Sequence, residues 1–159
     1  MNTIHKATLD DVPRLLHLIH GYWKFESIVG FDAERLAPEL ERFIREPTLG
    51  TAWIGVQDGR VVGYLIAVYV FSIEFMGLVA EFDEFFIEAE GRGNGLGTEM
   101  IRVAEEGCRQ AGCTYISLQV ARNNHIARRF YCRQGFRSKA GYELHEKILT
   151  VGWPMQRQS

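Results

Sequence analysis

Residues 80–99 read Ala-Glu-Phe-Asp-Glu-Phe-Phe-Ile-Glu-Ala-Glu-Gly-Arg-Gly-Asn-Gly-Leu-Gly-Thr-Glu, which predicts a strand, a glycine-rich turn and the start of a helix. Apolar and aromatic side chains with carboxylates among them fill 79–87, and glycine then occupies every second position from 91 to 97. Apolar residues from Leu96 to Ala104 repeat with helical spacing. A glycine-rich turn before a helix presents unpaired backbone N–H groups and the positive end of the helix dipole. The stretch therefore predicts a site for a phosphate or pyrophosphate group.

The sequence on either side of this stretch predicts short strands and amphipathic helices. Apolar spacing, capping residues and glycine or proline stops predict these elements: a strand at 3–8, a helix from Asp10 or Asp11 to about Phe25, a helix capped by Asp32 and closed by Pro47, strands at 52–56 and 61–71 joined at Asp58-Gly59, a strand at 79–88, a helix at 96–111, a strand at 115–120, a helix at 124–134, and one or two strands within 136–149. That order predicts an α+β fold with a mixed central β-sheet flanked by helices. We expect a single domain over residues 1–159, with a polar tail at 150–159 that frays.

The composition is that of an ordinary soluble globular domain. The 159 residues are 47% hydrophobic and 24% charged, and their net charge of −2 argues against nucleic acid as the main partner. No apolar run approaches the roughly 18 residues of a membrane span, and the first residues lack the apolar core of a signal peptide. Three cysteines without a CxxC spacing and five histidines without an HExxH motif favour free thiols and no metal. We therefore expect a cytoplasmic protein without a metal, membrane or nucleic-acid partner.

Three common phosphate loops do not fit residues 91–98. A Walker A loop needs a lysine after its glycines, and none follows here. A Rossmann fingerprint needs GxGxxG, but a start at Gly91, Gly93 or Gly95 puts another residue at its last position. A kinase needs further motifs that this short chain lacks. What remains is an R-x-x-G-x-G pattern from Arg92 to Gly97.

This pattern resembles the acyl-CoA pyrophosphate loop of the GNAT superfamily of N-acetyltransferases. A second block, residues 124–136, matches the family signature N-x-x-A-x-x-x-Y-x-x-x-G-F at every fixed position. Residues 4–11 also resemble the family's opening strand and helix cap, so the resemblance covers nearly the whole chain. It implies a GNAT-like acyl-CoA N-acyltransferase fold with acetyl-CoA as co-substrate. Ala89 and Gly91 depart from the family pattern, where a proline and a larger residue are usual, and we expect a looser turn there.

The resemblance implies that the glycine loop, the strand before it and the helix at 124–134 bind acetyl-CoA. Backbone amides of the loop hold the pyrophosphate, and the side chains of Arg92 and Thr98 add bonds to it. Phe86 and Ile87 hold the thioester end, with an N–H directed at the acetyl oxygen, although their side chains also suit the core. Asn124 bonds the pantetheine amides and equally suits the N-cap of its helix. The implied cofactor-binding residues are Phe86, Ile87, Arg92, Gly93, Asn94, Gly95, Leu96, Gly97, Thr98, Asn124, Ala127 and Tyr131.

The resemblance also implies a general acid and a base. Tyr131 lies two helical turns after Asn124, so both face one groove, and its family role is to protonate the CoA thiolate. An amine is mostly ammonium at neutral pH, so a base must remove a proton before attack. Glu81, Asp83 and Glu84 are the candidates, and the first two match family variants. Alternation puts Glu81 and Asp83 on one face of the strand and Glu84 on the other, unless a bulge shifts the register.

The acidic character of residues 74–90 predicts the substrate class. Six carboxylates and no basic residue occur there, so a cleft that they line attracts a cation, while a solvated acidic edge is the alternative. A weaker resemblance to the diamine and thialysine acetyltransferase branch places Tyr22, Trp23, Phe25 and Glu26 at the amine pocket, although they equally suit the core. We expect acetyl transfer to a small cationic primary amine by direct attack in a ternary complex.

Two other functions fit parts of this pattern. A protein or peptide N-acetyltransferase needs an open groove for an extended chain, which the sequence does not show. A non-catalytic acyl-CoA-binding sensor needs the loop and Asn124, but neither Tyr131 nor the strand carboxylates. The resemblance further implies a homodimer.

Overall fold

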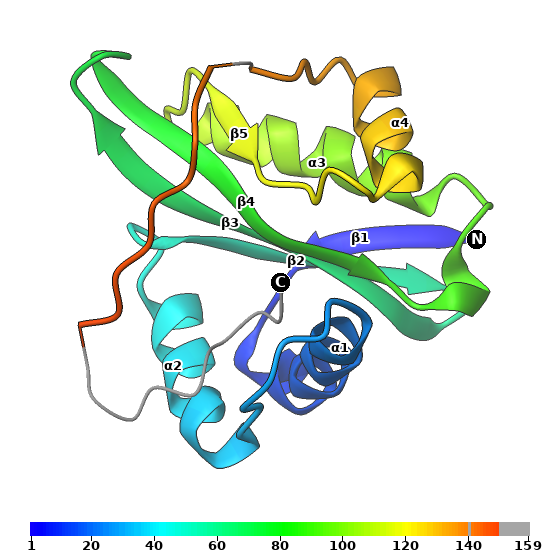
Figure 1. Ribbon diagram of the computed structural model, residues 1–159. Coiled ribbons are helices and arrows are strands. Elements are labelled where there is room, and N and C mark those ends of the chain that lie inside the picture. Colours follow the sequence, from blue (N-terminus) through cyan, green and yellow to red (C-terminus); the bar gives the residue numbers. More distant parts are fainter. Residues whose placement is uncertain (140, 150–159) are drawn as a thin grey trace.

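The computed structural model describes residues 1–139 and 141–149 (Figure 1). Two short 3-10 turns accompany strands and helices that follow one another in the predicted order from β1 to α4. Their bounds are β1 Asn2–Lys6, η1 Leu9–Asp11, α1 Val12–Phe25, α2 Ala33–Arg45, β2 Gly50–Gln57, β3 Arg60–Ser72, β4 Gly77–Ile87, η2 Ala89–Gly91, α3 Leu96–Gln110, β5 Ile116–Leu118 and α4 His125–Arg133.

The sheet has five strands in the order β1-β2-β3-β4-β5. The first four pair antiparallel, and β5 pairs parallel to β4 after the crossover through α3. Helices α1 and α2 cover one face of the sheet, and α3 and α4 lie on the other (Figure 1). The predicted α+β fold with a mixed sheet flanked by helices is therefore confirmed.

The core has one half on each face, because the side chains of a strand alternate between faces. On β3, Leu65 and Ala67 pack toward α3, whereas Tyr64 and Ile66 pack toward α1 and α2. All four side chains are buried. The sheet is thus covered on both faces, and β4 is held between two packed layers.

Local sequence signals fix several element ends. The Asp32 carboxylate accepts the N–H groups of Glu34 at 3.1 Å and Arg35 at 3.2 Å, so it caps α2 as predicted. Asp58 and Gly59 both have positive φ, 50° and 77°, which a two-residue turn matching the twist of β2 and β3 requires. This hairpin, too, is confirmed.

A β-bulge interrupts the pairing of β3 with β4 in the middle of the acidic stretch. Ala67 pairs with Phe82, the preceding residue Ile66 pairs with Glu84, and Asp83 is the extra residue on β4. Phe82 packs on the α3 side of the sheet, while Glu84 lies opposite Ile66 on the α1 side. Without the bulge, alternation would have put Glu84 on the same side as Phe82.

The C-terminal part of the fold differs from the expectation. Residues 136–139 and 141–149 contain no strand, although one or two were expected there. The neighbouring strand β5 has only three residues, so it offers too few backbone groups to pair with a further strand. Residues 141–149 instead cross the front of the molecule toward α2 (Figure 1). The expected frayed tail at 150–159 lies outside the described residues.

Candidate active site

The glycine loop ends in an open helix N-terminus. Gly93 and Gly95 have φ of +85° and +82°, a left-handed conformation that glycine adopts without steric cost. Helix α3 has no side-chain cap, and its first intrahelical bond runs from Glu99 N–H to Gly95 O at 3.1 Å. The N–H groups of Leu96, Gly97 and Thr98 therefore stand at the helix start as donors for an anion.

The three glycines of the loop act in different ways. A Cβ at Gly93 or Gly95 would meet no atom within 4 Å, so these two positions need glycine for their backbone conformation. A Cβ at Gly97 would lie 3.3 Å from the ring of Phe130, so this glycine lets α3 pack closely against α4. Gly93 and Gly95 are thus explained by the backbone, and Gly97 by helix packing.

Arg92 lies against the wall formed by the end of α1. Its Nε donates to Ile87 O at 2.8 Å, and its guanidinium stands 5.4 Å from the ring centre of Phe25 and 5.6 Å from that of Phe86. Cation–π contact with two rings holds the charge beside the loop. A fixed positive charge at this point suits a phosphate ligand.

The edge of β4 opens next to this loop. Strand β5 pairs with β4 only from Ala80 to Phe82, and no described strand pairs with that edge beyond Phe82. The Glu88 N–H donates to Val62 O of β3 at 2.8 Å. Because consecutive N–H groups of a strand point to opposite edges, the N–H of Ile87 points toward the open edge. An extended ligand arm can bond there, as expected for the pantetheine arm.

Helix α4 faces the open edge. Asn124 Oδ1 accepts the N–H of Ala127 at 3.1 Å, so the N-cap role of Asn124 is confirmed, and its amide N–H₂ is a further donor. Two turns later, the ring of Tyr131 packs edge-on against Phe130 and Phe136. Burial raises the pKa of Tyr131 to about 12, and the Glu26 carboxylate adds to the rise. The phenol therefore keeps its proton at neutral pH.

The β-bulge brings Glu84 to the side of the sheet that α1 covers. Its carboxylate accepts the N–H of Trp23 at 3.0 Å and the hydroxyl of Tyr64 at 2.7 Å. Burial, with the Glu84 carboxylate next, raises the pKa of Tyr64 far above its ordinary value, so Tyr64 remains a donor. Two fixed donors from α1 and β3 thus orient this carboxylate.

The other two strand carboxylates lie within the same short stretch. Glu81 pairs with Val68 and therefore shares the α1 and α2 side with Glu84, and it accepts an amide N–H of Gln119 at 3.2 Å. Asp83 is the exposed extra residue of the bulge. The simple alternation that separated Glu84 from Glu81 was therefore wrong, and the bulge is the physical reason.

A groove of about 2060 Å³ runs across the open edge of β4 and collects these groups. This volume is larger than the roughly 300–1,000 Å³ of a typical small-molecule site, so it has room for two ligands. Most of the predicted site residues line it: Tyr22, Trp23, Glu26, Glu81, Asp83, Glu84, Phe86, Ile87, Arg92, Gly93, Gly95, Gly97, Thr98, Asn124, Ala127 and Tyr131.

Asn94 and Leu96 are placed differently from these residues. Leu96 is the first residue of α3, and its side chain is 1% exposed in the core between α3 and the sheet, so only its backbone N–H is available to a ligand. The carbonyl of Asn94 accepts the side-chain amide of Asn2 at 3.3 Å. The Thr98 hydroxyl lines the groove but also accepts a bond from Gln134 at 3.2 Å, which ties α3 to the end of α4.

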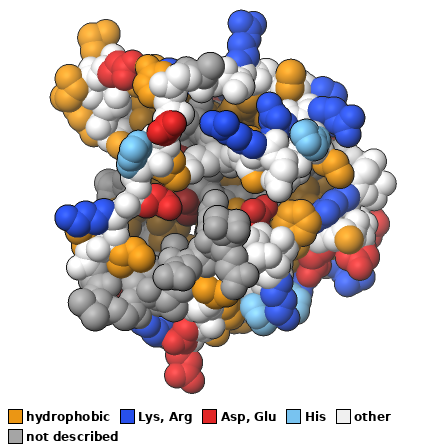
Figure 2. Space-filling model, viewed as in Figure 1, with side chains coloured by type: hydrophobic (Ala, Val, Ile, Leu, Met, Phe, Trp, Pro, Cys, Tyr) orange, Lys and Arg blue, Asp and Glu red, His pale blue; other side chains and the backbone are white. Residues whose placement is uncertain are grey.

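The charges of the groove differ between its two ends. Carboxylates come from the end of α1, the start and middle of α2 and the bulged part of β4, and they are Glu26, Asp32, Glu39, Glu81, Asp83 and Glu84. Arg35 of α2 lies among them, whereas Arg92, Arg122 and Arg133 lie on the loop and α4 side. Glu146 and Lys147 also line the groove. Figure 2 shows acidic side chains inside the hollow of this face and basic side chains above it. One end thus suits an anionic ligand and the other a cation.

Two residues that support the site, the buried Tyr64 and the groove residue Gln119, were not among those predicted from the sequence. Tyr64 orients Glu84, and Gln119 bonds Glu81. A tyrosine within a buried apolar strand needs a partner for its hydroxyl, so the sequence did carry a signal for Tyr64. Gln119 carries no such signal, because it meets Glu81 only when the sheet brings the two segments together.

Among the described residues, no group of three or more His, Cys, Asp or Glu side chains is arranged to hold a metal ion. In the same part of the chain, no helix is both long enough and apolar enough to span a membrane.

Comparison with known proteins identifies relatives of the chain. The sequence model of the acetyltransferase (GNAT) family matches residues 13–136. An uncharacterised N-acetyltransferase of Methanocaldococcus jannaschii is 36% identical over 83 residues, which are 52% of this chain and 49% of that protein. Another from the same organism is 28% identical over 158 residues, 95% of this chain and 64% of that protein. The chain thus matches between half and two thirds of the length of these relatives.

A solved structure agrees on the fold. A crystal structure of an aminoglycoside N-acetyltransferase in complex with CoA superposes with a TM-score of 0.80 at 15% identity, over 92% of this chain and 95% of that one. At this identity the likeness concerns the fold alone. The family match, which covers both the loop and the Tyr131 block, shows that the chain belongs to the GNAT family of acetyltransferases.

Proposed function

We propose that this protein transfers an acetyl group from acetyl-CoA to a small cationic primary amine, by direct attack in a ternary complex. The open helix N-terminus, the fixed Arg92 and the unpaired edge of β4 fit the pyrophosphate and the pantetheine arm of acetyl-CoA. Bound acetyl-CoA would supply a thioester carbonyl for the amine to attack and a thiolate as leaving group.

The side chains of the groove supply the remaining chemistry. A strand carboxylate accepts a proton from the ammonium group, which frees the nitrogen lone pair for attack. The N–H of Ile87 donates to the carbonyl oxygen, where negative charge develops as the C–N bond forms. When the C–S bond breaks, the Tyr131 hydroxyl gives its proton to the thiolate sulfur. The acetylated nitrogen passes its remaining surplus proton to the Tyr131 phenolate, and the strand carboxyl group releases its proton to solvent, so the products are the acetylated amine, free CoA and one proton.

The charge difference along the groove carries the proposal for the acceptor. The end beside the bulge is lined by six carboxylates and one arginine, Arg35, so its net charge is negative, and Glu84 is oriented there by two donors. A cation gains favourable interactions there, whereas a neutral or acidic acceptor does not. We assign Glu84 to binding the ammonium group, and Glu81 and Asp83 stay candidates for the base.

The test is the release of free CoA from acetyl-CoA, measured over polyamines, amino acids, aminoglycosides and peptides. We expect turnover with amines that carry one or more positive charges and little with neutral amines. Turnover with peptides alone would instead show a peptide N-acetyltransferase. Binding of CoA without turnover of any acceptor would show a sensor module.

We further propose that the protein is a homodimer, as the family resemblance implies, and that it is cytoplasmic, as the composition of the sequence indicates. Sedimentation velocity at micromolar concentration tests the assembly, and a monomer under these conditions would contradict it. Fractionation of cells that express the protein tests the location.

A further inference from the structure

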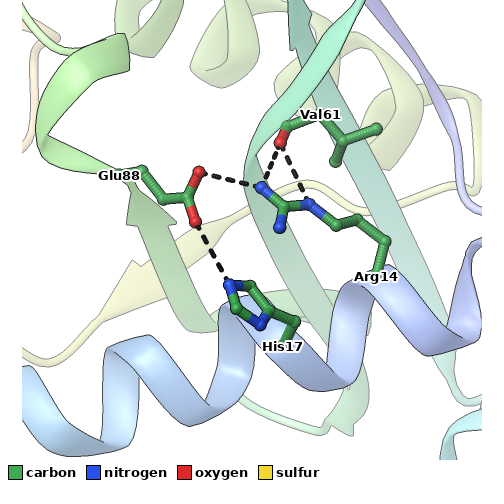
Figure 3. Close-up of polar contacts among 4 residues, drawn as sticks. All are labelled: Arg14, His17, Val61 and Glu88. Atoms are coloured by element: carbon green, nitrogen blue, oxygen red, sulfur yellow. Dashed lines mark hydrogen bonds and ion pairs between the residues drawn. The ribbon is translucent and has the colours of Figure 1, made fainter.

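An arginine on α1 joins three segments where the chain leaves the sheet for the glycine loop (Figure 3). The Arg14 Nη2 lies 2.8 Å from Glu88 Oε2, just beyond β4. The same guanidinium donates from Nη2 and Nε to the carbonyl of Val61 on β3, at 2.6 and 3.1 Å. One side chain thus connects α1, the start of β3 and the end of β4.

The backbone of Glu88 is fixed at the same point. Its N–H donates to Val62 O at 2.8 Å, and its carbonyl accepts the N–H of Gly91, the last residue of η2, at 3.0 Å. A Cβ at Gly91 would lie 2.9 Å from the Val62 side chain, so η2 packs directly on β3. Glu88 is therefore the residue from which the loop departs, and both its backbone and its side chain are held.

The loop needs such a fixed start. Gly93 and Gly95 follow within seven residues, and glycine populates both signs of φ readily, so the loop gains little rigidity from its own sequence. Amides that are already oriented bind an anion more tightly than amides that must be ordered on binding. The Arg14 and Glu88 side chains are only 34% and 22% exposed, which limits competition from water.

We propose that Arg14 and Glu88 are positioning residues for acetyl-CoA: their ion pair fixes the start of the glycine loop and so holds its amides ready for the pyrophosphate. Neither side chain lies among the described residues that line the groove. The inference rests on the proposed function, because it takes the loop as the pyrophosphate site.

The test is the Kd of CoA, measured by calorimetry on the full chain without any amine. Glu88→Gln removes the charge with little change in shape, and we expect its Kd to rise about threefold to tenfold. At saturating acetyl-CoA, kcat should stay within about twofold of wild type, because neither residue reaches the reacting atoms. Arg14→Lys keeps the charge but loses the fork to Val61, and we expect a smaller rise.

Two control variants separate positioning from general effects. Arg42 Nε and Glu46 Oε1 form an ion pair on α2 at 3.1 Å, so Glu46→Gln removes a comparable pair far from the loop and should leave the Kd unchanged. His17 Nε2 stands 3.7 Å from the other oxygen of Glu88 and is 66% exposed, so His17→Gln should change the Kd less than twofold.

The measurements distinguish a failure of the proposed function from a failure of the positioning role of Arg14 and Glu88. If wild-type protein does not bind CoA, the proposed function is wrong. If it binds CoA but Glu88→Gln and Arg14→Lys bind equally well, or Glu46→Gln weakens binding as much, the positioning role is wrong. If Glu88→Gln does not fold, Arg14→Lys alone decides, and an unchanged Kd for it overturns the inference.

Discussion

Tyr131 and Glu84 owe their properties to residues far away in the sequence. The pKa of Tyr131 is raised to about 12 by burial, with a contribution from Glu26 at the end of α1. Glu84 is oriented by Trp23 on α1 and Tyr64 on β3. The motif spacing predicted that Tyr131 faces the groove, but these partners come together only in the folded sheet.

The raised pKa of Tyr131 predicts the behaviour of the enzyme in alkaline solution. The phenol carries its proton below its pKa, so the acid is present up to about pH 12, whereas a tyrosine with its ordinary pKa of 10.0 would begin to lose it near that pH. We expect kcat at saturating amine to show no loss between about pH 8 and about pH 10.5. A fall in kcat with an apparent pKa near 10 that is absent in Tyr131→Phe would contradict the raised pKa of Tyr131.

The position of Glu84 predicts a role in amine binding. Glu84→Gln removes the negative charge but keeps an oxygen that can accept from Trp23 or Tyr64. We expect the KM of a cationic amine to rise about 10-fold or more, with a smaller change in kcat and an unchanged Kd of CoA.

The matched variants for this prediction are Glu81→Gln and Asp83→Asn. If Glu81 or Asp83 is the base, its variant should lower kcat at saturating amine rather than raise the KM of the amine. A large loss of kcat in Glu84→Gln with an unaltered KM would move the role of base to Glu84.

Strand β4 shows where prediction from the sequence succeeded and where it stopped. Apolar runs, glycines and caps sufficed for the order from β1 to α4, because these signals act over a few residues. The bulge at Asp83 depends on how β4 pairs with β3, so alternation alone put Glu84 on the wrong face. The expected strands within 136–149 failed for a similar reason, since strand formation there depends on the short partner β5.

The packing of α3 against the sheet gives a prediction on stability. A Cβ at Gly107 would lie 2.5 Å from the ring of Trp53, which is fully buried. Glycine to alanine within a helix normally stabilises by up to about 1 kcal/mol, but overpacking a core costs about 1–3 kcal/mol. We expect Gly107→Ala to lower the free energy of unfolding by about 1 kcal/mol in urea denaturation.

The control for this variant is Glu106→Ala, at an exposed position on the same helix. It should change the free energy of unfolding by less than about 0.5 kcal/mol. A more stable Gly107→Ala protein would mean that α3 does not pack on Trp53 as described.

The groove joins the two helical layers of the molecule at the open edge of β4. Its loop and α4 side carry arginines, and its α1 and α2 side carries more carboxylates than arginines, so the two sides suit ligands of opposite charge. Two specific sequence motifs predicted the loop and α4 side. The α1 and α2 side was predicted only in part, because the lining residues of α2 belong to no motif.

Room for both ligands predicts the kinetic pattern. In direct transfer both substrates are bound at once, so double-reciprocal plots of initial rate at several amine concentrations should intersect. Parallel lines would indicate a covalent acyl-enzyme, for which Cys132 beside Tyr131 would be the first candidate. Steady-state rates over a matrix of acetyl-CoA and amine concentrations distinguish the two patterns.

The measurement that bears most directly on acetyl transfer in this groove compares Tyr131→Phe with wild type. The variant keeps the ring that packs against Phe130 and Phe136 and removes only the proton donor. We predict that kcat with the best amine falls about 10²- to 10⁴-fold while the Kd of acetyl-CoA, measured by calorimetry, stays within about twofold. An undiminished kcat in Tyr131→Phe would contradict the role of Tyr131 as the general acid of acetyl transfer.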